Sequence, residues 1–173
     1  MTSRVARATS ASLLRRNFRA SFTAHAHGIL ATEFILVGKD REEFGRLRLG
    51  GTYEAKFDSK DHVAVLEASG TGYRLVLDGE EVRAIDKRLS GNELKIFCAD
   101  RTYKAQVSLF RSLAVASYPG GKKVVSLSGG LVGRSYEVLF DAEDACAFSV
   151  AIFLLWYITM NRRRAYRTRR GIM

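Results

Sequence analysis

Residues 145–160 read Ala-Cys-Ala-Phe-Ser-Val-Ala-Ile-Phe-Leu-Leu-Trp-Tyr-Ile-Thr-Met, sixteen residues without a charge. Asp141 and Asp144 precede this stretch and three arginines, residues 162–164, follow it, so the charges at both ends oppose the dipole of a helix. We therefore predict a helix over residues 141–161, with Asp141 as its N-cap. Because such a helix is apolar on every side, either protein or lipid must enclose it.

The length of the stretch favours enclosure by protein, although a span of a thin bilayer stays open. Seventeen residues lie between Asp144 and Arg162. At a rise of 1.5 Å per residue they span about 25 Å, which is less than the hydrocarbon thickness of about 30 Å. Enclosure by a sheet is the first expectation. The alternative is a single-pass membrane protein anchored by residues 145–160, with the arginines on the cytoplasmic or matrix side.

Short segments that alternate between apolar and polar residues precede the apolar stretch. Tyr103 and Val107 share one side of such a segment, and Lys104 lies on the other. Turn residues such as Asp78 and Gly79 separate the segments and favour hairpins. The predicted strands are residues 29–37, 52–57, 62–67, 73–78, 81–85, 93–98, 102–110, 111–117, 122–127 and 134–140. They predict a mainly β fold, a closed antiparallel barrel of about 10–12 strands around a central C-terminal helix.

Positive charge is concentrated at the two ends of the chain. The 173 residues include 28 Lys or Arg and 18 Asp or Glu, for a net charge of +10. Residues 1–24 contain five arginines and residues 161–173 contain six, without an acid, which leaves a net charge of −1 on residues 25–160. Basic tails on a nearly neutral body are typical of chains that contact anionic membranes or nucleic acid. The electrostatic candidates for lipid head groups are Arg15, Arg16, Arg19, Lys122, Lys123, Arg162, Arg163, Arg164, Arg167, Arg169 and Arg170.

These features divide the chain into three parts. Residues 1–28 are predicted to be a basic, disordered arm, residues 29–164 the barrel domain, and residues 165–173 a basic C-terminal tail. The Ser, Thr, Ala and Arg content of the arm also fits a mitochondrial transit peptide, which would place a eukaryotic protein in mitochondria. Otherwise we expect the chain at the cytoplasmic face of a membrane.

The sequence predicts no catalytic residue, no cofactor and no metal site. His25 and His27 alternate, but no cysteine or carboxylate lies nearby at a ligand spacing. The glycines of residues 70–72 lack the rest of a dinucleotide-binding motif. The two cysteines, Cys98 and Cys146, stand in apolar segments and are expected to be buried free thiols rather than a disulfide.

Residues 133–144 read Gly-Arg-Ser-Tyr-Glu-Val-Leu-Phe-Asp-Ala-Glu-Asp and run directly into the apolar stretch. This pattern resembles the end of tubby C-terminal-like domains, a superfamily that includes the tubby proteins, the LURP-one-related proteins and the phospholipid scramblases. The resemblance covers about residues 30–163. It implies a twelve-stranded barrel closed around a hydrophobic C-terminal helix, and it implies binding at membranes, with phosphoinositide recognition in tubby proteins.

Charge and resemblance together predict a non-enzymatic tubby-like barrel that associates with anionic phospholipid membranes through its basic tails. One alternative is the single-pass membrane protein described above. A second alternative is a small RNA-associated β domain, in which the same arginines contact nucleic acid.

Overall fold

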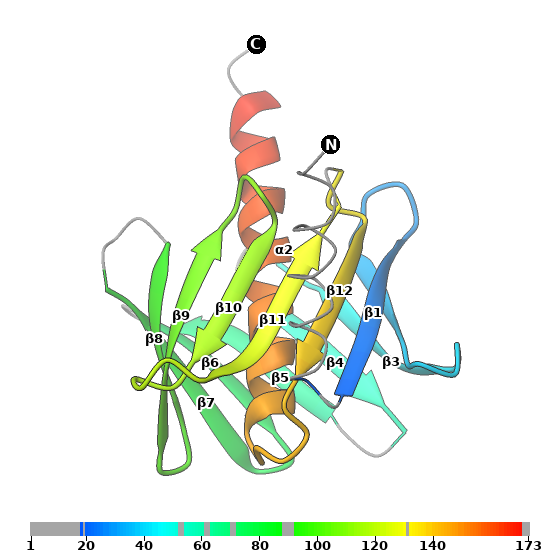
Figure 1. The fold of residues 1–173 in the computed structure, drawn as a ribbon. Coiled ribbons are helices and arrows are strands. Elements are labelled where there is room, and N and C mark those ends of the chain that lie inside the picture. Colours follow the sequence, from blue (N-terminus) through cyan, green and yellow to red (C-terminus); the bar gives the residue numbers. More distant parts are fainter. Residues whose placement is uncertain are drawn as a thin grey trace, which may run out of the picture.

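The computed structural model of this chain describes residues 18, 20–51, 54–60, 63–69, 72–87, 92–130 and 132–170. These residues form twelve strands and one long helix (Figure 1). The strands are β1 (Ala20–His27), β2 (Glu33–Val37), β3 (Glu43–Leu49), β4 (Glu54–Ser59), β5 (Val63–Ser69), β6 (Gly72–Leu77), β7 (Glu80–Asp86), β8 (Glu93–Cys98), β9 (Arg101–Ser108), β10 (Leu113–Ser117), β11 (Lys123–Gly129) and β12 (Ser135–Phe140). The helix is α2 (Ala147–Arg170).

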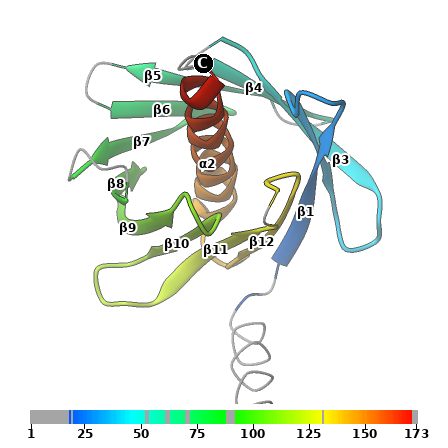
Figure 2. The ribbon, with the colours of Figure 1, turned by 90° about the horizontal axis from the view of Figure 1, so that it is seen from above.

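The strands close into one antiparallel barrel. Each strand pairs with the next along the chain, and β1 pairs with β12, which places Ala20 opposite Phe140 and His25 opposite Ser135. Seen along the helix axis, the strands surround α2 (Figure 2). The predicted mainly β fold, a closed antiparallel barrel with a C-terminal helix packed against the sheet, is confirmed.

The core combines the inward face of the strands with the whole apolar part of α2. In β9, Tyr103 and Val107 are buried while Lys104 is exposed, because successive side chains of a strand point to opposite faces. In α2, every side chain from Val150 to Ile158 is at most 1% exposed. Complete burial of one leucine, isoleucine or phenylalanine contributes about 1.5–3 kcal/mol to stability. Protein therefore encloses the apolar segment, as the first expectation had it.

This packing contradicts the alternative in which lipid encloses residues 145–160. Phe153, Leu154, Leu155 and Trp156 point to different sides of α2, and each is 0% exposed. No side of this part of the helix is left for lipid chains. Within the described part of the chain, no helix has a stretch that is both long and apolar enough to cross a bilayer.

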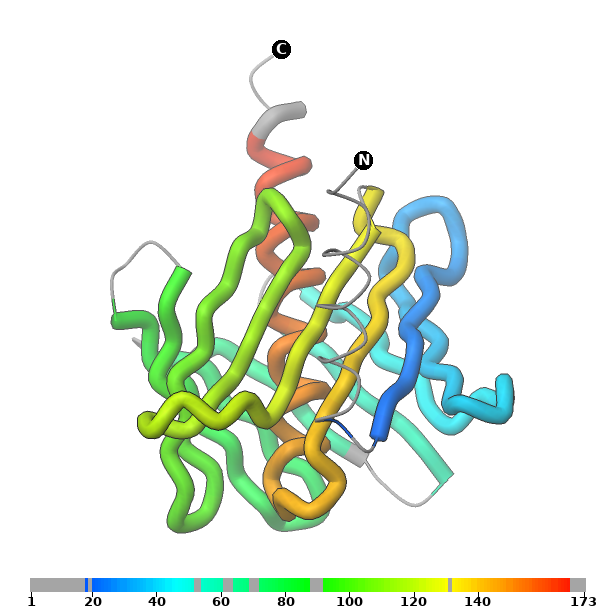
Figure 3. Tube along the Cα trace, in the orientation of Figure 1, coloured from blue at the N-terminus to red at the C-terminus, as the bar shows by residue number. Residues whose placement is uncertain are grey.

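Strands β1 and β3 are absent from the predicted set, and β1 corrects the boundary of the predicted arm. Residues 20–27 belong to the barrel and lie beside β12 (Figure 3). The inward residues of β1 include Ala24, whose small side chain gives little hydrophobic signal. In β3 an inward position is taken by Gly45, where a Cβ atom would lie 2.7 Å from the ring of Phe57. The rest of the arm, residues 1–17 and 19, and its interpretation as a transit peptide lie outside the described residues.

Both predicted ends of the helix are corrected. Helix α2 begins at Ala147, because Asp141 accepts the N–H of Glu143 at 3.0 Å and the chain turns before the helix starts. Asp144 caps the helix instead: its carboxylate accepts the N–H of Cys146 at 2.9 Å, and its carbonyl accepts that of Ala147 at 3.1 Å. At the other end the helix continues to Arg170 through most of the predicted tail, because arginine is a good helix former.

The expectation of two free thiols is wrong, because Cys98 and Cys146 form a disulfide. Cys98 is the last residue of β8, and Cys146 immediately precedes α2. Their Cα atoms are 6.2 Å apart, within the range that a disulfide spans. The two residues are 48 positions apart in the sequence. They meet only because α2 enters the barrel beside the last residue of β8.

Replacing Gly72 in β6 by alanine is expected to lower the free energy of unfolding by about 1–3 kcal/mol, because an added Cβ would lie 2.6 Å from the carbonyl oxygen of Ala84. The strand backbones would have to separate. Urea denaturation measures the change. Gly120→Ala is the matched control, since a Cβ there meets nothing within 4 Å. Equal stability of the two variants would contradict the close strand approach at Gly72.

Candidate functional site

The end of the barrel at which α2 leaves the sheet, called the exit end here, gathers loops that are distant in sequence (Figure 1). Neighbouring strands run in opposite directions, so every loop that follows an odd-numbered strand lies at the same end. The described residues of the exit end are 28–32, 50–51, 87, 92, 109–112, 130, 132–134 and 160–168. These residues include no aspartate or glutamate.

Exposed apolar side chains are concentrated at the exit end. Among the described residues eight large apolar side chains are exposed, and six of them belong to the exit-end loops, to the adjoining first residue of β10 or to α2. They are Ile29, Leu30, Phe110, Leu113, Val132 and Tyr166. Ile29 and Phe110 are 95% and 96% exposed. A soluble surface rarely gathers apolar side chains in this way without a contact to make, so this end is a candidate interaction surface.

Arginines of α2 stand among these apolar side chains. Arg162 and Arg163 are partly buried, whereas Arg164 and Arg167 are exposed. Their place in the C-terminal part of α2 suits the negative end of the helix dipole. Burial, and then the positive charge of Arg167, lower the pKa of Arg163 below its ordinary value. Since the like charges repel one another, a bound anion would stabilise this group.

Arg134 fixes the first of the exit-end loops. Its guanidinium donates hydrogen bonds to the carbonyl oxygens of Gly28 at 2.7 Å and Ile29 at 3.3 Å. The same loop turns through two residues with positive φ, Gly28 at 73° and Ala31 at 48°. The loop is therefore held in a defined conformation that leaves Ile29 and Leu30 pointing into solvent.

Two cavities flank α2 at the exit end. The larger, of about 570 Å³, is lined by the apolar residues of the loop at 29–31 and by several arginines. The smaller, of about 270 Å³, lies between α2 and the end of β3 and includes Leu49 and Trp156 in its wall. Arg163 and Arg167 line both cavities. Glu54 also lines the smaller cavity, whereas the described residues that line the larger one include no acid. The larger cavity thus combines an apolar wall with guanidinium groups alone, which suits an amphiphile with an anionic head.

The structure brings only part of the predicted basic set together. Arg162, Arg163, Arg164 and Arg167 share the exit end. Arg169 and Arg170 lie in the last turn of α2 with side chains outside the described ones, and Arg15, Arg16 and Arg19 lie outside the described residues.

Lys122 and Lys123 lie at the opposite end of the barrel, after β10. The ammonium group of Lys122 donates to Asp141 at 2.9 Å, and this contact raises the pKa of Lys122 and lowers that of Asp141. Lys122 is therefore already paired within the protein.

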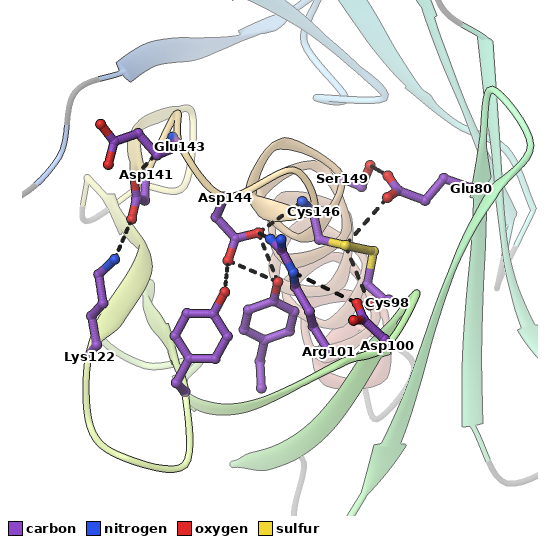
Figure 4. A network of polar contacts seen from close by, with 12 residues as sticks. Glu80, Cys98, Asp100, Arg101, Lys122, Asp141, Glu143, Asp144, Cys146 and Ser149 are labelled. Carbon is purple, nitrogen blue, oxygen red and sulfur yellow. Dashed lines mark hydrogen bonds and ion pairs between the residues drawn. A yellow bond between two sulfur atoms is a disulfide. The ribbon is translucent and has the colours of Figure 1, made fainter.

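A buried carboxylate at this opposite end ties the start of α2 to the sheet (Figure 4). Asp144 accepts hydrogen bonds from the hydroxyl of Tyr103 at 2.9 Å, from the hydroxyl of Tyr118 and from Arg101 at 2.7 Å. Burial raises the pKa of Asp144, but the donated hydrogen bonds, that of Tyr118 first, outweigh burial and leave the pKa below its ordinary value. Burial, and then Asp144, raise the pKa of Tyr103, so its hydroxyl keeps its proton. Both oxygens of this carboxylate accept hydrogen bonds from the protein, so Asp144 has a structural role and is not available as a general base.

One group of side chains in the described part of the chain has the spacing of metal ligands. The ligand atoms of Glu80, Cys98 and Cys146 all lie within 4.8 Å of one another. The sequence predicts no metal site, and these three residues are distant from one another along the chain. One feature of the sequence could have pointed to Glu80. The alternation of β7 puts this carboxylate on the same inward face as Val82 and Ala84, where a charge is unusual.

Comparison of the chain with models of known protein families, with curated proteins and with solved structures finds no match.

Proposed function

We propose that this protein is a non-enzymatic barrel that docks on anionic phospholipid membranes through its exit end, at the cytoplasmic face of the membrane. We also propose that it is a tubby-like domain. The support for the second proposal is a closed twelve-stranded antiparallel barrel with one C-terminal helix, together with the sequence pattern of residues 133–144.

One observation carries the membrane proposal: exposed apolar side chains and arginines share one end of the barrel, without an acid in its loops. Apolar side chains such as Ile29 and Phe110 gain free energy by entering the boundary between head groups and acyl chains. Guanidinium groups such as those of Arg164 and Arg167 bind lipid phosphates at the same depth. A surface that combines exposed apolar side chains with guanidinium groups is therefore more stable at an anionic membrane than in water.

The protein is expected to bind an anionic membrane with modest affinity. Each arginine near an anionic surface contributes about 1 kcal/mol, so the four arginines at 162–167 would contribute about 4 kcal/mol together. The apolar loop residues add to this attraction only when they reach the acyl boundary. Attachment of this strength is reversible and weakens as salt screens the charges.

Replacing Arg163 and Arg167 by glutamine is expected to weaken binding to anionic vesicles by about 2 kcal/mol, which is about 30-fold. The full chain is sedimented with vesicles of phosphatidylcholine alone and of phosphatidylcholine with phosphatidylserine. Wild-type binding should rise with the phosphatidylserine content, and the double variant should lose most of that rise.

The double variant Lys122→Gln/Lys123→Gln is the matched control, since it removes the same charge from the opposite end. Because Lys122 bonds to Asp141, its fold is verified by circular dichroism. Near wild-type binding is expected. Equal losses in both double variants, or equal binding of the wild type to neutral vesicles, would contradict docking through the exit end. A salt-dependent shift with single-stranded RNA, without vesicle binding, would favour the nucleic-acid alternative.

A further inference from the structure

The end of the barrel opposite the exit end holds a second cluster, formed by the first residue of β7, the last residue of β8 and the entry to α2 (Figure 4). Its members are Glu80, Cys98, Cys146 and Ser149. Both cysteines are 1% exposed and Ser149 is 2% exposed, whereas Glu80 is only partly buried and links the cluster to solvent. The cluster plays no part in the membrane surface described above.

Glu80 is the unusual member of this cluster, because its side chain lies on the apolar inward face of β7. One carboxylate oxygen accepts the hydroxyl of Ser149 at 2.7 Å. The other lies 3.4 Å from the sulfur of Cys146. A disulfide sulfur has no proton to donate and no charge to offset that of a carboxylate. A thiol would donate a hydrogen bond to this oxygen, and a metal ion held by the sulfurs would bind it directly.

We propose that, once the disulfide is reduced, Cys98, Cys146 and Glu80 bind a thiophilic divalent metal ion such as Zn²⁺. Reduction by a phosphine or a dithiol adds two electrons and two protons to the disulfide and gives two thiols. The metal ion then displaces both thiol protons to solvent, and the sulfurs bind it as thiolates.

The geometry of the cluster suits this ion. Zn–S bonds of about 2.3 Å and Zn–O bonds of about 2.0–2.2 Å place tetrahedral ligand atoms about 3.5–3.8 Å apart. The three ligand atoms already lie within 4.8 Å of one another, and an oxygen of Glu80 lies 3.4 Å from the sulfur of Cys146. Binding an ion therefore requires the two sulfurs to separate and the remaining distances to adjust by about 1 Å or less. Two thiolates favour Zn²⁺ over Ca²⁺ or Mg²⁺, which prefer oxygen ligands. Cys146 also immediately precedes the first turn of α2, where the helix dipole stabilises a thiolate.

Asp144 is excluded from the ligand set by its own contacts. Its oxygens are engaged by Tyr103, Tyr118 and Arg101. The protein thus supplies three ligands, and a water molecule entering past Glu80 fills the fourth tetrahedral position.

The test uses the full chain in two redox states. The oxidised protein and the phosphine-reduced protein are titrated with Co²⁺ without oxygen, and the thiolate-to-cobalt charge-transfer absorption is recorded. The reduced protein should develop this absorption to one equivalent, Zn²⁺ should abolish it by competition, and the oxidised protein should show none. Absence of the band in the reduced protein would overturn the proposal. Loss of the barrel's circular dichroism on reduction would overturn it too, because the site requires a folded reduced protein.

Glu80→Gln tests the carboxylate ligand. The amide keeps a similar volume and an acceptor for Ser149 but loses the charge, and we expect Co²⁺ affinity to fall at least 10-fold. Glu81→Gln is the matched control: the adjacent carboxylate lies on the outer face of β7 with Arg74 and Arg83, and its loss should leave affinity unchanged. Equal affinities of the two variants would contradict a role for Glu80 in the site. Retention of the band in reduced Cys98→Ser would contradict the paired thiolates.

Discussion

Replacing Phe153 by alanine will lower the free energy of unfolding by about 3–5 kcal/mol. Phe153 is fully buried, and its ring centroid lies 5.8 Å from that of Trp156, 6.1 Å from that of Tyr157 and 6.4 Å from that of Tyr73. Alanine would leave a cavity among these rings, and the closed sheet resists collapse around it because every strand is hydrogen-bonded on both sides. Urea denaturation followed by circular dichroism measures the loss.

Phe110→Ala is the matched control for this prediction. It removes the same atoms from a side chain that is 96% exposed in the loop after β9. Its stability should stay within about 0.5 kcal/mol of the wild type. If Phe153→Ala cost no more than Phe110→Ala, the helix would not be the packed centre of the barrel.

Replacing Asp144 by alanine is expected to lower the free energy of unfolding by about 2–4 kcal/mol. The hydroxyl of Tyr103 is buried and would lose its acceptor, which costs about 1–3 kcal/mol. The N–H of Cys146 would lose its cap as well, which costs about 1 kcal/mol. Both losses act at the junction between the sheet and α2, so we expect the start of the helix to loosen first. Amide hydrogen exchange of residues 146–150, together with urea denaturation, measures this.

The neighbouring substitution Glu143→Ala isolates the role of Asp144. Glu143 is exposed, and its removal should change stability by less than about 0.5 kcal/mol. Tyr118→Phe should give an intermediate loss, since it removes one donor and leaves the carboxylate and its other donors in place. If the Asp144→Ala variant were as stable as the Glu143→Ala variant, the hydrogen bonds around Asp144 would not hold the helix to the sheet.

The fold was predictable from the sequence where the hydrophobic pattern is strong. The uncharged stretch at 145–160 predicts a helix that must be buried on every side. The alternating segments from residue 52 onward predict strands with an apolar face that can surround it. The prediction failed where an inward position holds a small residue, as at Ala24 in β1 and Gly45 in β3, because such residues mark no apolar face. The helix start was placed too early because Asp141 and Asp144 carry the same capping signal, and only the tyrosines around Asp144 select between them.

The candidate sites were less predictable, because both depend on which strand ends meet. The arginines at 162–167 are visible in the sequence, but their apolar neighbours Ile29 and Phe110 join them only through the alternating direction of the strands. Lys122 and Lys123 were grouped with those arginines by charge alone, and the same alternation places them at the far end. The disulfide between Cys98 and Cys146 likewise depends on where the helix enters the barrel.

The pairing of β1 with β12 also determines when the barrel is completed during translation. Ala20 finds its partner only after Phe140 has been synthesised, and the helix that fills the centre follows still later. The nascent chain on the ribosome is therefore an open sheet with unpaired edges and an uncovered apolar face, a form prone to aggregation. The barrel can therefore close only after β12 has emerged, and its centre is filled only after α2 has followed.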